Sequence, residues 1–265
     1  MTTGVVAALP AEARCLAAGP TRVGEMRVVS EHVLLYVAGL GPDAARTACE
    51  ALLSTGAAAL VSWGIAAGLD PALGPGTLVL ADRVLVMSGR DGTPNEIRAP
   101  LDAPVALAAG GRAVQSESWS DRLAGRVRGM VPVVRCAVAC PQHVLHTPAQ
   151  KRELAQRGAM AADMESAAVA QAARSAGVPW LAVRAVADAA DVRLPPDIMR
   201  AMDRQGRIRA MRLATALLRH PWDIAALPPL ARGFHAALRT LRAVADRAGP
   251  TLLAPMLPHA PGIAS

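Results

Sequence analysis

The stretch ADMESAAVA at residues 162–170, followed by RAVAD at residues 184–188, decides the fold of this 265-residue chain. The first stretch starts an apolar helix and carries a carboxylate, Glu165, close to that start. The second ends an apolar strand and places another carboxylate, Asp188, at its end. Open α/β sheets bind ligands at helix starts and at the carboxyl ends of parallel strands. The two acids therefore predict a site in an α/β protein.

These two carboxylates are expected to have different surroundings. The pattern predicts a helix over 163–176 with Asp163 as its N-cap and Glu165 in its first turn, where the helix dipole favours an ionised carboxylate. The strand over 180–186 should be buried, so Asp188 at its edge is expected to have a raised pKa and to remain a proton donor near neutral pH. Capping alone is the simpler interpretation of Asp163 and Glu165. Two acids in contrasting environments suit a division between acid and anion.

Short apolar strands alternate with helices along the first three quarters of the chain. This alternation predicts the α/β class: a three-layer αβα single domain around a central mixed, mostly parallel sheet. The expected strands are residues 4–9, 33–38, 58–62, 77–80, 131–139 and 180–186, and the expected helices are residues 43–54 and 163–176.

The composition changes near residue 198. We expect a catalytic domain over residues 1–197, a basic amphipathic helical extension over 198–248 and an irregular tail over 249–265. From Asp197 onward the chain has ten Arg, four Asp and no Lys, a net charge of +6. An apolar stripe at helical spacing runs through the extension; it consists of Leu230, Phe234, Leu238, Leu241 and Val244.

Composition also excludes several classes of protein. Apolar residues make up 52% of the chain, yet no uncharged run is long enough to cross a bilayer as a helix. The N-terminus lacks a signal-peptide pattern and the four cysteines are unevenly spaced, which favours a reduced, cytoplasmic protein. An aromatic content of 2% argues against nucleic acid as a partner, because single strands are bound by aromatic stacking.

A glycine-rich turn, GLGPDA at residues 39–44, follows the second expected strand and matches the dinucleotide-binding spacing. Two observations speak against a dinucleotide. The next strand ends in VSWG at residues 61–64, without an acid for a ribose hydroxyl, and Pro42 falls among the amides that a pyrophosphate needs. A tight turn between strand and helix is the favoured interpretation.

Two cysteines and two histidines, which are common metal ligands, also lie close together, but their spacing is not that of a zinc ribbon or knuckle. Buried thiols and loop histidines explain them better, so no metal site is expected. They are Cys136, Cys140, His143 and His146.

The ordered motifs resemble the nucleoside phosphorylase superfamily, with the methylthioadenosine/S-adenosylhomocysteine nucleosidases as the nearest group. The resemblance covers about residues 1–195. It is carried by GVVAALPAE at residues 4–12, GIAAGL at 64–69, GPGTLV at 74–79, DMESAA at 163–168 and RAVADAAD at 184–191.

The resemblance implies roles for five residues in cleaving an N-glycosidic bond. Asp188 would protonate the purine at N7, and Glu165 would hold the ribose hydroxyls while its charge stabilises the cationic sugar. Met164 would pack against the ribose. Glu12 would activate the attacking water, with Arg184 orienting both. An acid at position 12 would repel phosphate, which favours water as the nucleophile.

The chain departs from this family at three positions. Ile65 follows Gly64 where the nucleosidases have serine, and Ala187 replaces the serine before the acid. His143 lies near the position of an aromatic residue that stacks on the purine. Gly64, Ile65 and His143 therefore join the expected substrate-binding set.

The extension resembles that of the hopanoid-associated phosphorylases, in its DRQGR segment at residues 203–207 and its basic amphipathic helices. This implies adenosylhopane, an adenosine-containing lipid, as substrate and a peripheral contact with the inner membrane face. Packing of the apolar stripe on the body, or on a second subunit of a homo-oligomer, is equally consistent with the pattern.

The favoured hypothesis is therefore a purine N-ribosyl hydrolase that releases adenine from adenosylhopane and requires no cofactor. Three alternatives stay open. Phosphate could be the co-substrate, the enzyme could be a methylthioadenosine/S-adenosylhomocysteine nucleosidase, or the chain could be a non-catalytic purine-nucleoside binding protein. Glu12, Glu165, Arg184 and Asp188 occur together, which argues against the last of these.

Overall fold

The computed structural model describes residues 2–87, 95–98, 118–197 and 218–249, together with residues 201, 209, 211, 215 and 252. The DRQGR segment and nearly all of the tail from residue 250 lie outside these residues. No helix in the described part of the chain is long and apolar enough to span a membrane.

The described residues form a nine-stranded mixed sheet. Its order is β2-β3-β1-β4-β8-β7-β5-β6, and β9 pairs with both β4 and β5. Five of the strand pairings are parallel and four are antiparallel. The strands are β1 (Thr2–Ala7), β2 (Met26–Ser30), β3 (Val33–Val37), β4 (Ala57–Gly68), β5 (Leu78–Val86), β6 (Asn95–Arg98), β7 (Val133–Cys140), β8 (Ala161–Ala162) and β9 (Trp180–Asp188).

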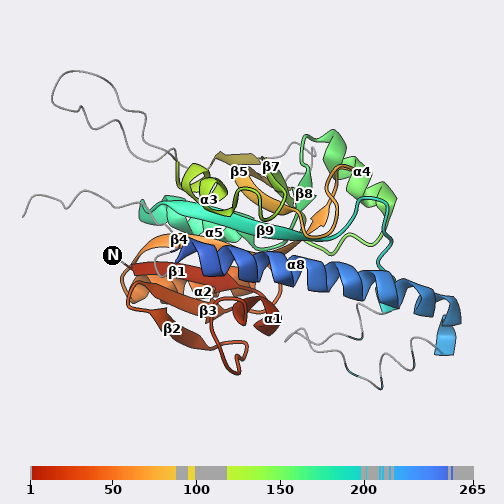
Figure 1. Ribbon diagram of the computed structural model, residues 1–265, viewed down its shortest axis with the longest axis horizontal. Helices are drawn as coiled ribbons and strands as arrows, with labels where there is room; N and C mark the ends of the chain where they lie inside the picture. Colours follow the sequence, from red (N-terminus) through yellow and green to blue (C-terminus); the bar gives the residue numbers. More distant parts are fainter. Residues whose placement is uncertain are drawn as a thin grey trace, which may run out of the picture.

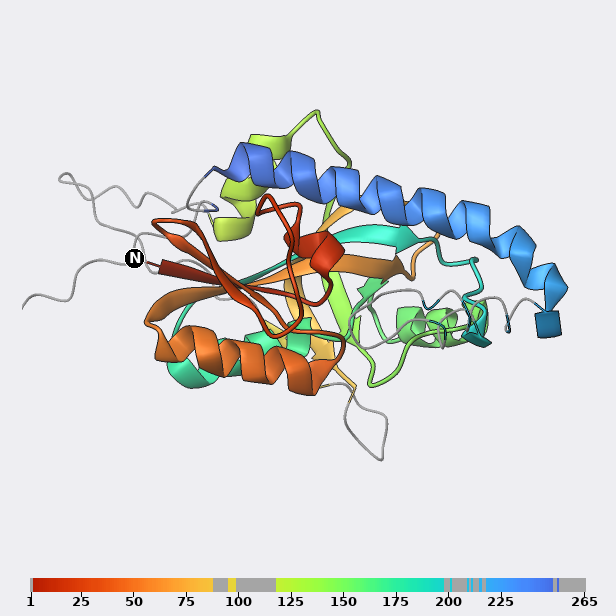
Figure 2. The ribbon, with the colours of Figure 1, turned by 90° about the horizontal axis from the view of Figure 1, so that it is seen from below.

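Helices cover both faces of this sheet, so the predicted three-layer α/β fold is confirmed (Figures 1 and 2). Apolar residues of α2 and α5 pack on one face, and those of α1, α3 and α8 pack on the other. The helices are α1 (Pro10–Ala13), α2 (Pro42–Ser54), α3 (Trp119–Val127), α4 (Pro148–Gln156), α5 (Ser166–Ala176), the 3-10 helix η1 (Pro221–Ala226) and α8 (Leu227–Ala248).

Helix α8 lies along the sheet and belongs to its core (Figure 2). Ala237, Leu241 and Val244 are fully buried beside residues of β1, β4 and β9. The backbone of Gly233 lies directly against the carbonyl of Ala187, so closely that no Cβ fits there. Three residues of the apolar stripe predicted for the extension, Leu238, Leu241 and Val244, therefore pack on the body of the protein.

Three parallel neighbours in the sheet position the site. Strand β4 pairs with β1 on one side and with β9 on the other, and Gly64 is in register with Arg184. Strand β4 continues to Gly68, beyond the predicted end at residue 62, because its pairing with β9 continues to Asp188. The strand ends, α1 and the start of α5 thus meet at one edge of the sheet.

Candidate active site

A cavity of about 160 Å³ lies at this edge. Its lining combines carboxyl groups with apolar side chains from several separate regions of the chain. Of the eight predicted site residues, six line it, and they are Glu12, Ile65, His143, Met164, Glu165 and Asp188. The other two, Gly64 and Arg184, do not line the cavity.

Glu12 is held at one wall by the backbone. It lies in α1, directly after β1, and is 1% exposed. Its Oε2 accepts a hydrogen bond from the amide of Leu9 at 2.8 Å, and its Oε1 accepts one from the amide of Ile65 at 2.9 Å. Burial raises the pKa of Glu12, whereas Arg184 and these amides oppose the rise. A fixed carboxyl with a raised pKa suits a general base.

Glu165 is the N-cap residue of α5, and the helix begins at Ser166. The predicted N-cap, Asp163, was wrong by two positions, and Glu165 precedes the first turn instead of lying in it. The side chain of Asp163 accepts hydrogen bonds from the amides of Glu165 and Ser166, just before the helix begins. The Oε1 of Glu165 accepts a hydrogen bond from the amide of Gly41 at 2.9 Å. The glycine turn thus holds an acid of the site, and Gly41 needs its positive φ of 98° to do so.

Arg184 lies behind the cavity wall and is 1% exposed. Its guanidinium forms ion pairs with Asp163 and, at 3.8 Å, with Glu165. It also donates hydrogen bonds to the hydroxyls of Ser62 and Ser166. These contacts hold the carboxyl groups of Asp163 and Glu165 in place. Arg184 itself is not one of the residues that line the cavity.

Gly64 allows Arg184 and Glu12 to approach each other. A Cβ at this position would lie 2.5 Å from Nη1 of Arg184 and 2.6 Å from Oε1 of Glu12. Real Cβ atoms do not come so close to other atoms, so any larger residue would push these two groups apart. Gly64 therefore acts by leaving space next to the acids.

The charges of this cluster do not balance. Asp163, Glu165 and Glu12 all act electrostatically on the one guanidinium of Arg184. Burial raises the pKa of Glu165 to about 7, because the stabilising effect of Arg184 is smaller than the cost of burial and is further reduced by Asp163. An excess of carboxyl groups beside a small apolar cavity favours a ligand that develops positive charge.

Asp188 approaches the cavity from the end of β9. Its Oδ2 forms a buried ion pair with Lys151, which lies in α4. Burial raises the pKa of Asp188, and Lys151 opposes the rise. The predicted proton donor is thus a carboxyl group with a raised pKa, in a setting separate from the cluster around Arg184.

Sequence reasoning missed Lys151, Ser62 and Ser166. The two serines are small polar residues in apolar segments, and only the folded chain shows that they contact Arg184. Lys151 had a signal in the sequence, because it is the only lysine among 28 basic residues.

The remaining predicted residues complete the lining. Met164 and Ile65 are half-buried, and His143 is exposed in the loop between β7 and α4. Ile65 offers no hydroxyl, so its contribution to the polar contacts is its amide, which is bonded to Glu12.

Two of the four residues considered for zinc, Cys140 and His146, have hydrogen-bond partners in the protein. Cys140 donates a hydrogen bond to Oδ1 of Asp163 at 3.0 Å, and burial raises the pKa of this thiol. The Nδ1 of His146 lies 3.2 Å from the carbonyl of Leu194. Within the described ranges, no group of three or more His, Cys, Asp or Glu residues could hold a metal ion.

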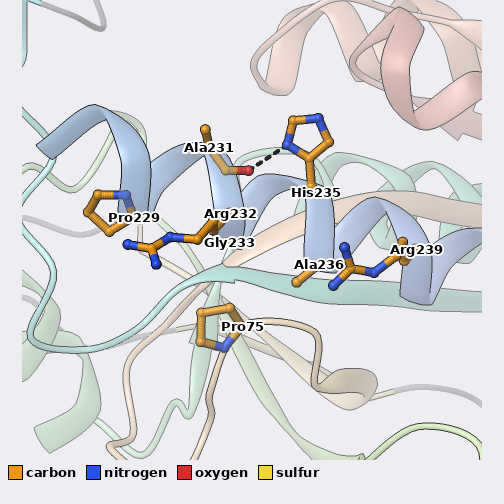
Figure 3. A pocket seen from close by; sticks show the side chains of 8 residues that line it. All are labelled: Pro75, Pro229, Ala231, Arg232, Gly233, His235, Ala236 and Arg239. Atoms are coloured by element: carbon orange, nitrogen blue, oxygen red, sulfur yellow. Dashed lines mark hydrogen bonds between the residues drawn. The ribbon is translucent and has the colours of Figure 1, made fainter.

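A second, more open hollow lies between α8 and Pro75 (Figure 3). Figure 3 shows Arg232, His235 and Arg239 on α8 around it, and the Nδ1 of His235 bonded to the carbonyl of Ala231. These three basic side chains are exposed and the hollow contains no acid. It therefore lacks the carboxyl groups that line the first cavity.

Solved structures share this fold. The 5′-methylthioadenosine/S-adenosylhomocysteine nucleosidase of Colwellia psychrerythraea, in complex with adenine, is 15% identical with a TM-score of 0.59, and the match covers 96% of this chain and 94% of that chain. A mutant of the Helicobacter pylori nucleosidase with 5′-methylthioadenosine in its active site is 15% identical, with a TM-score of 0.57 and coverage of 92% and 98%. Futalosine hydrolase of Helicobacter pylori is 16% identical, with a TM-score of 0.57 and coverage of 93% and 97%.

The sequence was also compared with curated proteins and with models of protein families. No curated protein matched it. Residues 5–219, which are most of the chain, match the family model described as the Phosphorylase superfamily. This match confirms the prediction of an enzyme of the nucleosidase and nucleoside phosphorylase class. The chain belongs to the phosphorylase superfamily.

Proposed function

We propose that this enzyme hydrolyses the N-glycosidic bond of an adenosine-type nucleoside. The observation that carries the proposal is one cavity lined by two differently placed acid groups. Glu12 and Glu165 belong to the cluster around Arg184, and Asp188 is paired separately with Lys151. The solved structures of the same fold with methylthioadenosine and adenine support this class of substrate.

The steps follow from this arrangement. Asp188 gives its proton to N7 of the purine, and the electron pair of the bond between N9 and C1′ moves into the purine ring. The ribose becomes cationic at C1′, where the charge of Glu165 stabilises it. A water attacks C1′ and gives a proton to Glu12. The products are free purine and a ribose with a hydroxyl at C1′.

Glu12 supports water rather than phosphate as the nucleophile. Its carboxyl oxygens already occupy the amides of Leu9 and Ile65, which are the donors an anion could use at this wall. A carboxylate held there also repels a phosphate dianion.

Mass spectrometry of the products tests this proposal. The enzyme is incubated with methylthioadenosine or adenosylhopane, each with and without phosphate. We expect adenine and the free ribosyl product at the same rate in both buffers. A ribose 1-phosphate derivative would instead show phosphorolysis, and a bound but unchanged nucleoside would show a binding protein.

We further propose that the 5′ substituent is apolar, as in adenosylhopane. Support comes from the lining, in which Leu9, Leu40, Val144 and Leu194 provide hydrocarbon and Leu40 is 41% exposed. A faster reaction with adenosylhopane than with methylthioadenosine is the expected result. The reverse preference would favour a methylthioadenosine/S-adenosylhomocysteine nucleosidase.

A membrane contact is proposed for the segment that precedes α8. Trp222 and Ile224 in η1 are 67% and 52% exposed, and Met211 and Leu218 are also exposed. Figures 1 and 2 show this end of α8 projecting away from the sheet. Exposed apolar side chains in a basic segment suit an anionic lipid surface.

The double substitution Trp222→Ser and Ile224→Ser is therefore expected to weaken binding to anionic liposomes at least about tenfold, through the loss of apolar area that could enter the lipid. Cosedimentation with liposomes measures this. Cleavage of soluble methylthioadenosine should not change, because neither residue lines the cavity. Unchanged sedimentation would remove η1 from the membrane proposal.

The activity is expected to depend on pH in a bell-shaped manner. Glu165 must be ionised to stabilise the cationic ribose and Glu12 must be ionised to take a proton from water, so kcat/KM should fall on the acid side as these two carboxylates, whose pKa values are raised by burial, become protonated. Asp188 must be protonated, so kcat/KM should also fall as the pH rises through its raised pKa. Initial rates of adenine release across the pH range measure both limbs. A profile with no fall on the acid side would contradict the ionised state proposed for Glu165 and Glu12.

A further inference from the structure

Lys151 is a buried cation directly behind the acid at the end of β9. Its side chain is fully buried, and it does not line the cavity. Its Nζ donates hydrogen bonds to Oδ2 of Asp188, to the carbonyl of Ala189 at 2.6 Å and to the carbonyl of Val192 at 3.1 Å. An ammonium group has three protons, and these three acceptors use all of them.

The geometry of this site fits lysine and not arginine. The three acceptors converge on one nitrogen atom, whereas a guanidinium spreads its donors over a planar fork. The other residues among the 28 Lys and Arg are all arginines, so position 151 is the single place where this sequence has lysine.

Through these hydrogen bonds the same lysine also holds a loop that borders the cavity. Ala189 and Val192 belong to the segment after β9, which leads to the lining residue Leu194. The amide of Leu194 donates to the carbonyl of His146 at 3.0 Å, and Nδ1 of His146 lies 3.2 Å from the carbonyl of Leu194. The loop before α4 and the loop after β9 are thus joined on the side of the cavity where Asp188 lies.

We propose that Lys151 is a positioning residue that acts through Asp188, holding Oδ2 from behind so that Oδ1 meets the purine. This inference rests on the proposed function. When the proton moves from Asp188 to N7 of the purine, a carboxylate remains in a buried place. The ammonium of Lys151 balances that negative charge, so the transfer of the proton becomes easier.

A purely structural role for the ion pair predicts different behaviour. Replacement of a buried ion pair partner often changes stability, whatever the pair does in catalysis. A structural residue would alter folding, and through it the amount of active enzyme, but not the pH at which Asp188 loses its proton. The pH profile therefore separates the two roles.

Three variants and a control make the test. Lys151→Met removes the charge with little change in size, and Lys151→Arg keeps the charge but not the convergent geometry. Arg152→Met is the matched control, because Arg152 is an exposed cation in the same helix. The double variant Lys151→Met with Asp188→Asn removes both charges, and comparing its stability with that of Lys151→Met shows how much of any loss comes from leaving Asp188 buried without its partner.

In Lys151→Met we expect kcat to fall by about 10- to 100-fold through misplacement of the acid, with little change in KM. The alkaline limb of kcat/KM should move up by about one pH unit or more, because a cation next to Asp188 has been lost. Lys151→Arg should lower kcat while leaving that limb near its original pH. A limb in Lys151→Met that coincides with the limb of Arg152→Met overturns the proposal.

A second readout covers the remaining outcomes. The carboxyl carbon signal of Asp188, assigned with Asp188→Asn, is titrated by NMR in the full chain. Its pKa should rise in Lys151→Met even if the wild type cleaves no nucleoside, in which case the proposed function fails and the effect of Lys151 on Asp188 stands. If only Lys151→Arg folds, unchanged kcat and an unchanged pH profile in that variant overturn the proposal.

Discussion

Asp188→Asn is expected to lose nearly all turnover while purine-nucleoside binding persists. The amide of asparagine can still form a hydrogen bond to N7, but it has no acidic proton to transfer. General acid catalysis contributes a factor of about 10²–10⁴ to such reactions, and the loss should be of this size. Adenine release in a single turnover measures the chemistry, and calorimetric titration with methylthioadenosine measures the binding.

The matched control for this substitution is Asp191→Asn. Asp191 lies three residues further along the same segment and is exposed, so its carboxyl should be dispensable. Circular dichroism of both variants checks that the fold is kept, because Asp188→Asn also breaks the ion pair with Lys151. Equal turnover in Asp188→Asn and the wild type would remove Asp188 from the proposed role.

The central strands and the helices α2 and α5 could be predicted because their sequences carry strong apolar patterns. Val33–Val37, Pro42–Ser54 and Trp180–Asp188 lie within two residues of their expected bounds. The short elements β2, β6 and β8 lacked such a pattern. Strands β2 and β6 lie at the edges of the sheet, and β8 has only two residues. Such strands place few side chains in the core, so their sequences show no recognisable apolar pattern.

The candidate site could be predicted as far as its acids, because each acid directly follows a strand or starts a helix. The partners of those acids could not. Lys151 contacts Asp188 across 37 residues, and Ser62 contacts Ser166 across 104 residues. Local patterns show which face a side chain takes on its own element, but not which other element it meets.

The apolar stripe of α8 is another case in which the sequence predicts the element but not what it contacts. Its spacing predicts a helix with one apolar face, and that helix is present. Whether the face meets lipid or protein depends on the shape of the sheet below it. The close approach of Gly233 to Ala187 decides in favour of protein, because a helix with a larger residue there could not come so near to β9.

Glu12→Gln is expected to reduce hydrolysis by about 10²–10⁴-fold, the contribution of a general base. Glutamine is almost the same size, but its amide nitrogen cannot accept a hydrogen bond. Since the amides of Leu9 and Ile65 both point at this side chain, one of them would lose its partner. Glu12→Asp keeps the charge and should retain more activity than Glu12→Gln. Glu50→Gln on the exposed surface of α2 is the matched control.

Glu12→Ala separates the two possible roles of this acid, activation of water and exclusion of phosphate. Without the carboxylate, the amides of Leu9 and Ile65 become free donors next to a less negative cavity, which is a setting that binds anions. We expect phosphate to raise the rate of adenine release in Glu12→Ala and to have no effect on the wild type. A ribose 1-phosphate derivative formed by Glu12→Ala alone would identify Glu12 as the residue that restricts the enzyme to water. If phosphate accelerates both proteins equally, Glu12 does not exclude it, and the wild type is a phosphorylase.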